Sequence, residues 1–284
     1  MNRITVIVGS TTIDTIIQNG LNLLKIGGVT AYAGYTFQRL GFQTKAISNI
    51  APSDRAVSAF FIKNGIELLN GQTPITTRFV NHYTEDGRLQ QMPFHAAPIQ
   101  TDVIAEVLKT CEVVHFGPLH PEDIELAGMK QAYKEKRQVL LDIQGYVRRV
   151  KGVDICFSVS PIVYEALSYA SYVKAEATEL EWVLKDSRRT VEQLIERYGI
   201  AELVVTCGER GGYIATSRGR TAYGACPAQA IVDPTGAGDV FFAAYSASRI
   251  YHRKNIEEAC RFAAFLAAEQ ICGNYIPFDA LHLN

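Results

Sequence analysis

The sequence predicts an α/β fold in which a central, mostly parallel sheet carries helices on both faces. Three observations predict it. Strand-like and helix-like stretches alternate along the chain, 48% of its 284 residues are hydrophobic, and two segments, 11–27 and 75–95, interrupt the alternation. A chain of this length buries a substantial core. We therefore expect residues 1–284 to form one domain, in which those two segments stand outside the alternating pattern.

Short apolar runs rich in β-branched residues predict buried parallel strands. These runs lie at 4–8, 44–48, 113–116, 138–143, 170–174 and 202–207. Helical periodicity fills many of the intervals, notably 29–40, 52–64, 101–110, 122–136, 189–198, 237–251 and 256–271. Repeated strand-then-helix units favour a parallel sheet with helices on both faces.

The segment 75–95 is typical of two strands joined by a turn at Asp86 and Gly87. Such a pair has nothing to pack on within the alternating α/β pattern. The segment 11–27 lies between the first strand and the first long helix and is short. Both segments therefore stand apart from the strand-and-helix alternation.

Composition and charge exclude several classes of protein. The formal net charge is −1, whereas a nucleic-acid surface normally needs a concentrated basic face. The six cysteines are scattered without metal-ligand or disulfide spacing. The N-terminus has no signal-peptide pattern, and no apolar run reaches the roughly 18 residues of a membrane span. We expect a cytoplasmic protein with reduced cysteines.

The segment 231–243 is the most informative in the chain. It reads Ile-Val-Asp-Pro-Thr-Gly-Ala-Gly-Asp-Val-Phe-Phe-Ala, so two glycines and an acid precede an apolar helix. Gly236 and Gly238 let backbone N–H groups converge on one point, and the helix aims its positive end there. Asp239 lies in the first turn. An anion site beside a carboxylate indicates phosphoryl transfer, with Asp239 taking a proton from an attacking hydroxyl. The alternative is an ordinary strand–turn–helix junction with a capping acid.

Two other glycine motifs do not fit this segment. A Walker A loop needs Gly-Lys-Ser or Gly-Lys-Thr after four spacer residues, and the chain has no such string. A dinucleotide fingerprint needs a small residue where Phe241 stands, and it belongs early in a chain. A dinucleotide-dependent oxidoreductase is therefore disfavoured.

The chain resembles the ribokinase-like (PfkB-type) carbohydrate kinases in four blocks that occur in the right order. Asp233 to Asp239 matches their signature Asp-x-x-Gly-Ala-Gly-Asp, and residues 6–14 look like their first strand and the acid that follows it. Gly27-Gly28 with the helix ending Arg39-Leu40-Gly41 is similar to their di-glycine hinge and first long helix. Residues 204–212 look like their Thr-x-Gly-x-x-Gly nucleotide segment.

The resemblance implies that the segments 11–27 and 75–95 form a small β lid over the acceptor site. Because the first segment is short, we expect no large lid-to-lid dimer contact of the kind found in the family. The resemblance also implies roles for individual residues. The backbone of Gly236, Ala237 and Gly238 would form the anion hole, and Asp239 would be the catalytic base. The acceptor would contact Asp14, Gly27, Gly28, Arg78, Arg88 and Asp142, which lie after strands, at the helix entry or in the lid. A solvated surface position is the alternative for the two arginines, and a turn-forming role is the alternative for Asp142.

The resemblance also implies ATP and Mg²⁺ as cofactors. The nucleotide would lie along Thr206, Gly208, Gly211, Ala264 and Asn274. The family usually carries Asn-x-x-Glu to organise the magnesium water shell, whereas this chain has Glu176 and Glu179. A second carboxylate suits magnesium, which prefers oxygen ligands. The alternative is that Glu176 is only an exposed acid at a helix start.

The resulting hypothesis is an ATP-dependent kinase that phosphorylates a hydroxyl of a small polyol or sugar. Both asparagines of the family's sugar-kinase segment are replaced within residues 27–34, and the pattern Gly-Gly-x-x-x-Tyr-Ala-Gly looks more like the branch that includes inositol kinases. Inositol is the first candidate, and a nucleoside or pentose is the alternative. A catalytically weak binding relative remains a second class of hypothesis. We expect a small-molecule substrate, no nucleic acid or membrane partner, and a monomer or small homo-oligomer.

Overall fold

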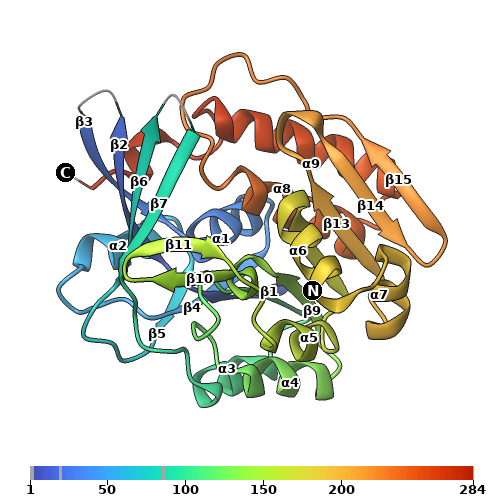
Figure 1. The fold of residues 1–284 in the computed structure, drawn as a ribbon. Helices are drawn as coiled ribbons and strands as arrows, with labels where there is room; N and C mark the ends of the chain where they lie inside the picture. The colour runs from blue at the N-terminus through green and yellow to red at the C-terminus, as the bar shows by residue number, and fades with distance from the viewer. Residues whose placement is uncertain (1–2, 19–20, 85–86, 284) are drawn as a thin grey trace.

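The computed structural model describes residues 3–18, 21–84 and 87–283 and contains two sheets (Figure 1). The larger sheet has nine strands in the order β15-β14-β13-β12-β9-β8-β1-β4-β5. The run from β13 to β5 is parallel, and β14 and β15 join the β13 edge as an antiparallel pair. The strands are β1 (Ile4–Gly9), β4 (Gln43–Ser48), β5 (Glu67–Asn70), β8 (Val113–Gly117), β9 (Gln138–Asp142), β12 (Tyr172–Glu176), β13 (Glu202–Thr206), β14 (Gly212–Thr216) and β15 (Gly219–Tyr223).

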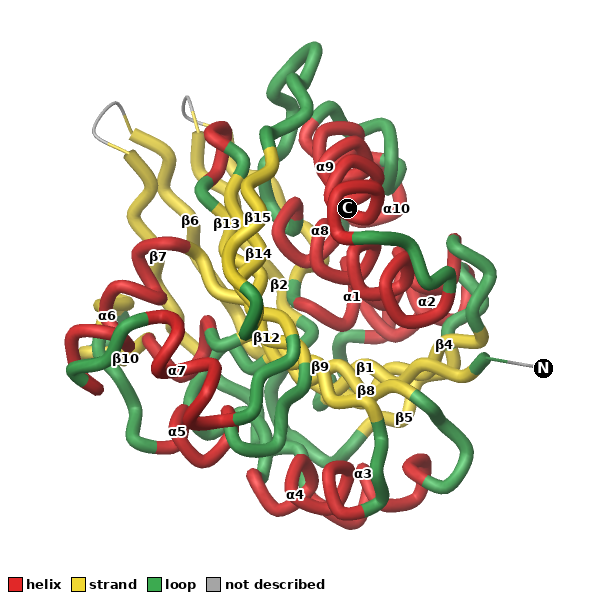
Figure 2. Tube along the Cα trace, turned by 90° about the vertical axis from the view of Figure 1, so that its right-hand side faces the viewer, coloured by secondary structure: helices red, strands yellow, loops and turns green. Residues whose placement is uncertain are grey.

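Helices cover both faces of this sheet, as the turned view in Figure 2 shows. One face carries α1 (Val29–Arg39), α2 (Arg55–Lys63), α8 (Ala237–Ser246), α9 (Ile256–Ile271) and α10 (Phe278–Leu281). The other carries α3 (Thr101–Leu108), α4 (Leu126–Lys134), α5 (Ile162–Leu167), α6 (Ala177–Ser187) and α7 (Val191–Tyr198). Side chains alternate across the strands. In β1, for example, Ile7 packs into the first core, and Val6 and Val8 pack into the second.

The smaller sheet stands beside the larger one and forms the lid (Figure 1). Its order is β10-β11-β7-β6-β2-β3. The strands are β2 (Thr12–Gln18), β3 (Leu21–Gly27), β6 (Thr77–Thr84), β7 (Gly87–Phe94), β10 (Arg148–Lys151) and β11 (Asp154–Phe157). β2 and β6 are parallel neighbours, and the other pairs are antiparallel.

The predicted α/β fold with a small lid is confirmed, and the lid is larger than predicted. The hairpin of β10 and β11 adds two strands through a pairing of Asp154 with Gln91. The sequence gives little sign of this hairpin because each strand has only four residues, which is too short to show a clear alternation. Of the predicted turn between β6 and β7, Asp86 lies outside the described residues.

Each strand and helix predicted for the α/β core has a counterpart in the structure. Sequence periodicity missed the short strand β5, the antiparallel pair β14 and β15, and the helices α5 and α6. No helix within the described ranges is both long enough and apolar enough to cross a bilayer.

The parallel strands β1, β8, β9 and β12 all end at one edge of the large sheet, close to the point where the chain enters the lid from β1 into β2. Ligands bind at this edge in open α/β sheets. The side chains that follow these strands are therefore candidates for contact with a ligand.

Candidate active site

Helix α8 begins at the glycine-rich loop that the sequence singled out. Gly236 is its N-cap, with φ of 76° in the left-handed region. A Cβ on Gly236 would lie 2.2 Å from the ring of Tyr32 on α1. Glycine is therefore required here both by the backbone conformation and by the contact with Tyr32. The first N–H groups of a helix have no partner within it, so the start of α8 offers donors to an anion.

A cavity of about 140 Å³ lies between this loop and the lid. Both sheets contribute to it, and most of its lining is polar or glycine. The lining residues are Thr12, Asp14, Gly28, Tyr32, Phe79, Gln90, Leu119, Gln144, Arg148, Lys174, Pro234, Thr235, Gly236, Gly238 and Asp239. The predicted acceptor acid Asp14 and the predicted base Asp239 thus line one cavity.

Asp239 has an unusually high pKa for a carboxylic acid. Burial raises its pKa to about 7, and the carboxylates of Asp142 and Glu179 add to the increase, although Lys174 and Arg148 oppose it. An acid with a pKa near neutrality is suited to accept and release a proton at that pH. Such perturbed groups in a cleft are typical of functional sites.

Lys174 is the main residue of the site that sequence analysis missed. It lies in β12, and its buried ammonium donates to Asp142 Oδ2 over 2.5 Å. A Cβ on Gly238 would lie 3.3 Å from Lys174 Nζ, so the ammonium lies directly beside the anion loop. The available signal was a lysine within an apolar strand, since an ammonium is almost never fully buried without a partner.

Asp142, predicted to contact the acceptor, therefore has a different position from Asp14. Asp142 is buried, accepts the Lys174 ammonium and also accepts from the backbone N–H of Gln144 at 3.0 Å. It is not among the residues that line the cavity.

Asp14 is 5% exposed and lies on β2 with its carboxylate at the cavity. The hydroxyl of Thr12 donates to it over 2.6 Å. A Cβ on Gly27 would lie 2.6 Å from Asp14 Oδ2, so Gly27 makes room for this carboxylate. Gly28, with φ of 89°, lines the cavity and begins α1.

Comparison with known proteins identifies the family of the chain. The sequence pattern described as pfkB family carbohydrate kinase matches residues 35–274. The chain belongs to this family. It is 28% identical to a ribokinase from Arabidopsis thaliana over 61% of this chain and 44% of the relative, so less than half of that ribokinase is spanned. It is 27% identical to a cytidine kinase from Thermococcus kodakarensis over 93% of this chain and 94% of the relative.

A solved structure with the same fold is a pyrophosphate-dependent kinase of the ribokinase family, complexed with a pyrophosphate analog and myo-inositol. It superposes with a TM-score of 0.81 at 20% identity and covers 94% of each chain. At 20% identity, this likeness is evidence of a shared fold alone.

Arg148 is the second cation at the cavity, and it comes from the hairpin that the sequence did not reveal. Its guanidinium donates to Gln90 Oε1 on β7 over 3.0 Å, and this hydrogen bond joins β10 to β7 within the lid. Together with Lys174 it supplies two positive charges to a cavity that also holds two carboxylates.

The two arginines predicted for the lid lie elsewhere or are not described. Arg78 pairs with Asp54 at the start of α2, with an N–O distance of 3.1 Å, and it does not line the cavity. The side chain of Arg88 lies outside the described residues.

The five residues predicted to hold a nucleotide do not line the cavity. Thr206, Gly208 and Gly211 lie at the end of β13 and in the turn after it. A Cβ on Gly211 would lie 2.2 Å from the carbonyl oxygen of Tyr223, so the chain itself occupies the space beside this glycine. Ala264 is buried on α9, and the side chain of Asn274 donates to Glu269.

Glu176 and Glu179, the predicted magnesium residues, form the capping box of α6. Glu176 accepts from Thr178 N, and Glu179 Oε2 accepts from Glu176 N, each over 2.9 Å. Glu179 is buried, and its pKa is raised by burial, against the opposing charge of Lys174. Among the described residues, no three histidines, cysteines or acids are grouped as a closed metal site would require.

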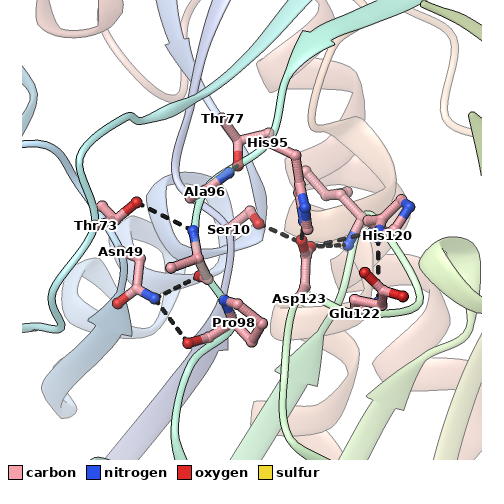
Figure 3. A network of polar contacts seen from close by, with 12 residues as sticks. Ser10, Asn49, Thr73, Thr77, His95, Ala96, Pro98, His120, Glu122 and Asp123 are labelled. Atoms are coloured by element: carbon pink, nitrogen blue, oxygen red, sulfur yellow. Dashed lines mark hydrogen bonds and ion pairs between the residues drawn. The ribbon is translucent and has the colours of Figure 1, made fainter. Parts of the chain in front are cut away.

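A polar network connects the lid to the core through Asp123 (Figure 3). Asp123 accepts from Ser10 after β1 and from the backbone N–H of Leu119 after β8, and it contacts His95 Nε2 after β7 at 2.5 Å. Since Leu119 lines the cavity, this network fixes one cavity wall to the end of a lid strand.

Proposed function

We propose that this protein is a kinase that transfers a phosphoryl group to a hydroxyl of a small polyol, with inositol as the first candidate. One observation carries the proposal. A single cavity of about 140 Å³ contains a buried carboxylate for the acceptor, a carboxylate with a pKa near 7, and the start of α8. These are the parts that transfer to an alcohol requires: an acceptor site, a base and an anion site.

Asp239 acts on the proton of the acceptor hydroxyl. Its raised pKa leaves it substantially ionised at neutral pH while making it a better proton acceptor than an ordinary carboxylate. Asp14 orients the acceptor by accepting hydrogen bonds from neighbouring hydroxyls. A carboxylate has two oxygens for this purpose, which suits a ligand rich in hydroxyl groups.

The negative charge of the transferring group meets three sources of positive potential. These are the backbone N–H groups at the start of α8, the ammonium of Lys174 and the guanidinium of Arg148. Preorganised donors of this kind stabilise charge in a site that excludes water. The lid excludes water as competing acceptor, and Arg148 belongs to the lid.

Mg²⁺ fits the oxygen donors near the loop, through water. Glu179 is the first candidate to hold it. The carboxylates of Asp142 and Asp239 lie close enough to Glu179 to interact with it electrostatically, so several oxygen donors are gathered there. When bound, the ion would neutralise charge on the donor phosphates. Glu176 commits a carboxylate oxygen to the backbone of α6, which supports a capping role for it.

ATP is the first candidate donor, as in the sequence-based hypothesis, and inorganic pyrophosphate is the second. One observation supports pyrophosphate as the alternative donor. The basic side chains of Lys174 and Arg148 line the cavity together with the anion loop, whereas none of the five predicted nucleotide residues lines it. The solved relative that depends on pyrophosphate has the same fold. A nucleoside or pentose remains the alternative acceptor, and the cytidine kinase relative supports it.

A two-way assay tests the proposal. The purified protein is incubated with ATP or pyrophosphate, each with and without Mg²⁺, and with myo-inositol, ribose, fructose or cytidine. Phosphorylated product is measured by mass spectrometry. Product from myo-inositol with either donor supports the proposal and identifies the donor. Product from cytidine or ribose alone contradicts the acceptor, and donor binding without any product favours a binding relative.

A further inference from the structure

Lys25 lies in the lid strand β3, yet its ammonium reaches the anion loop. Its side chain is 1% exposed, and Nζ donates to the carboxylate of Asp233, the first residue of the loop. Asp233 Oδ1 also accepts from the backbone N–H of Thr235 over 3.0 Å. Asp233 therefore folds the loop onto itself with one oxygen and attaches it to the lid with the other.

The same ammonium also contacts the loop through an aromatic ring. Lys25 Nζ lies 5.5 Å from the centroid of the Tyr32 ring, which is within cation–π range. Tyr32 packs directly on Gly236, where a Cβ would lie 2.2 Å from its ring. Lys25 thus supports the loop at Asp233 and, through Tyr32, at Gly236.

Lys25 is also the cross-strand partner of Asp14. The two residues are paired in the antiparallel register of β2 and β3, so their side chains project from the same face. One buried cation therefore stands between the carboxylate proposed to hold the acceptor and the loop proposed to hold the phosphoryl group.

The pairing is electrostatically significant because both groups are largely removed from water. Burial alone would raise the pKa of Asp233, but the charge and hydrogen bond of Lys25, with the donors of Thr235, lower it below its ordinary value. Removing one member of a buried pair leaves the other charge uncompensated. The loop would then lose its attachment to the lid.

We infer that Lys25 is a positioning residue that holds the Asp233–Asp239 loop in register with the acceptor site by its contacts with Asp233 and Tyr32. The inference rests on the proposed function for its catalytic consequence. The loop geometry itself is testable without catalysis, since inorganic pyrophosphate probes the anion site directly. A shift of about 1 Å in a reacting group costs on the order of 10²-fold in rate.

The test compares Lys25→Met, Lys25→Arg and Asp233→Asn with a control, Lys45→Met. Lys45 pairs with Glu67 of the neighbouring strand β5 at 3.0 Å, and neither residue lines the cavity, so its loss removes an ion pair that has no contact with the proposed site. Pyrophosphate binding is measured by calorimetry, unfolding by urea, and kcat and acceptor KM with the donor found above.

We expect Lys25→Met and Asp233→Asn to weaken pyrophosphate binding at least about tenfold and to lower kcat by about 10²-fold. Lys25→Arg should retain part of the pyrophosphate affinity and part of kcat, and Lys45→Met should change neither quantity. The double variant Lys25→Met/Asp233→Asn should lose no more than the worse single variant, because the two residues act as one unit.

Chemical rescue separates positioning from general damage to the fold. In Lys25→Ala, n-propylammonium can supply the missing three carbons and the charge, and it should restore pyrophosphate binding and kcat, whereas n-propanol should not. Variants that unfold more easily but bind pyrophosphate and turn over like the wild type would overturn the inference. A wild type that binds pyrophosphate without turnover would contradict the proposed function alone, and the binding comparison would still decide the role of Lys25.

Discussion

Lys174 in the middle of β12 and Asp142 at the end of the neighbouring strand β9 form a buried ion pair, with 2.5 Å between Nζ and Oδ2. The same ammonium is adjacent to Gly238 at the start of α8. It raises the positive potential where Asp239 ionises, while Asp142 reduces it. The two members of the pair therefore change, in opposite directions, the pKa that burial raises in the proposed base.

The pH profile should respond in opposite directions to the two members of this pair. The acid limb of kcat/KM should lie near pH 7 in the wild type, since Asp239 must lose its proton before it can act. Lys174→Met removes a charge that lowers the pKa of Asp239, so the limb should move to higher pH. Asp142→Asn removes one that raises it, so the limb should move to lower pH. Shifts in the same direction for both variants would contradict the electrostatic account.

Substitutions of the two glycines of the anion loop should have different effects on stability and activity. Gly236→Ala puts a Cβ into the Tyr32 ring at a positive φ, so stability should fall together with activity. A Cβ on Gly238 meets only the flexible end of Lys174, 3.2 Å from Cε. Gly238→Ala should therefore fold normally and lose turnover by about tenfold or more because it displaces a charge-stabilising donor. Urea unfolding and kcat measured on the same samples check this. Normal turnover in a folded Gly238→Ala would mean that the phosphoryl group lies elsewhere.

Asp14 should affect the acceptor far more than the donor. Charge-assisted hydrogen bonds contribute roughly 1.5–3 kcal/mol each, so Asp14→Ala should raise acceptor KM by about 10-fold to 100-fold. Asp14→Asn retains an acceptor for the Thr12 hydroxyl and serves as a milder variant. Steady-state kinetics with each substrate varied in turn give both constants. Equal effects on the two KM values would show that the substrates are placed wrongly.

His115 should make the fold sensitive to acid. Burial lowers its pKa from 6.5 to about 4, and neither ring nitrogen has a hydrogen-bond partner among the described residues. Between pH 6.5 and about 4, His115 is protonated in the unfolded chain but neutral in the folded chain. The free energy of unfolding therefore falls as the pH drops from 6.5 towards 4. The difference of pKa corresponds to about 3 kcal/mol.

Urea unfolding at several pH values measures this effect, with His115→Leu as the control. The wild type should lose more unfolding free energy than the variant over that range. Parallel pH dependence of the two proteins would show that His115 does not contribute.

The sequence was sufficient for the α/β core because its strands are apolar runs and its helices are periodic. It also predicted functional roles for the loop before α8 and for Asp14, since both lie in local motifs that have a physical interpretation. These positions depend on neighbours in sequence. The strands β10 and β11 could not be recognised because four-residue strands have almost no periodicity, and their place in the lid depends on tertiary pairing with β7.

The charge arrangement of the site was equally hard to read from sequence. Lys174, Arg148 and Lys25 are brought to the loop by three different strands, β12, β10 and β3. Asp142 was recognised as a functional candidate, but its pairing with Lys174 depends on the adjacency of β9 and β12. The assignments of the base, acceptor, nucleotide and magnesium residues stay predictions until they are measured.

The most direct measurement is single-turnover phosphoryl transfer by Asp239→Asn compared with the wild type, with donor binding measured on the same samples. The substitution keeps the size of the side chain and removes its ability to take a proton. The account predicts that donor binding changes little and that the rate of transfer falls by about 10²–10⁴-fold, the usual contribution of a positioned general base. A folded Asp239→Asn protein that transfers at nearly the wild-type rate would contradict the account.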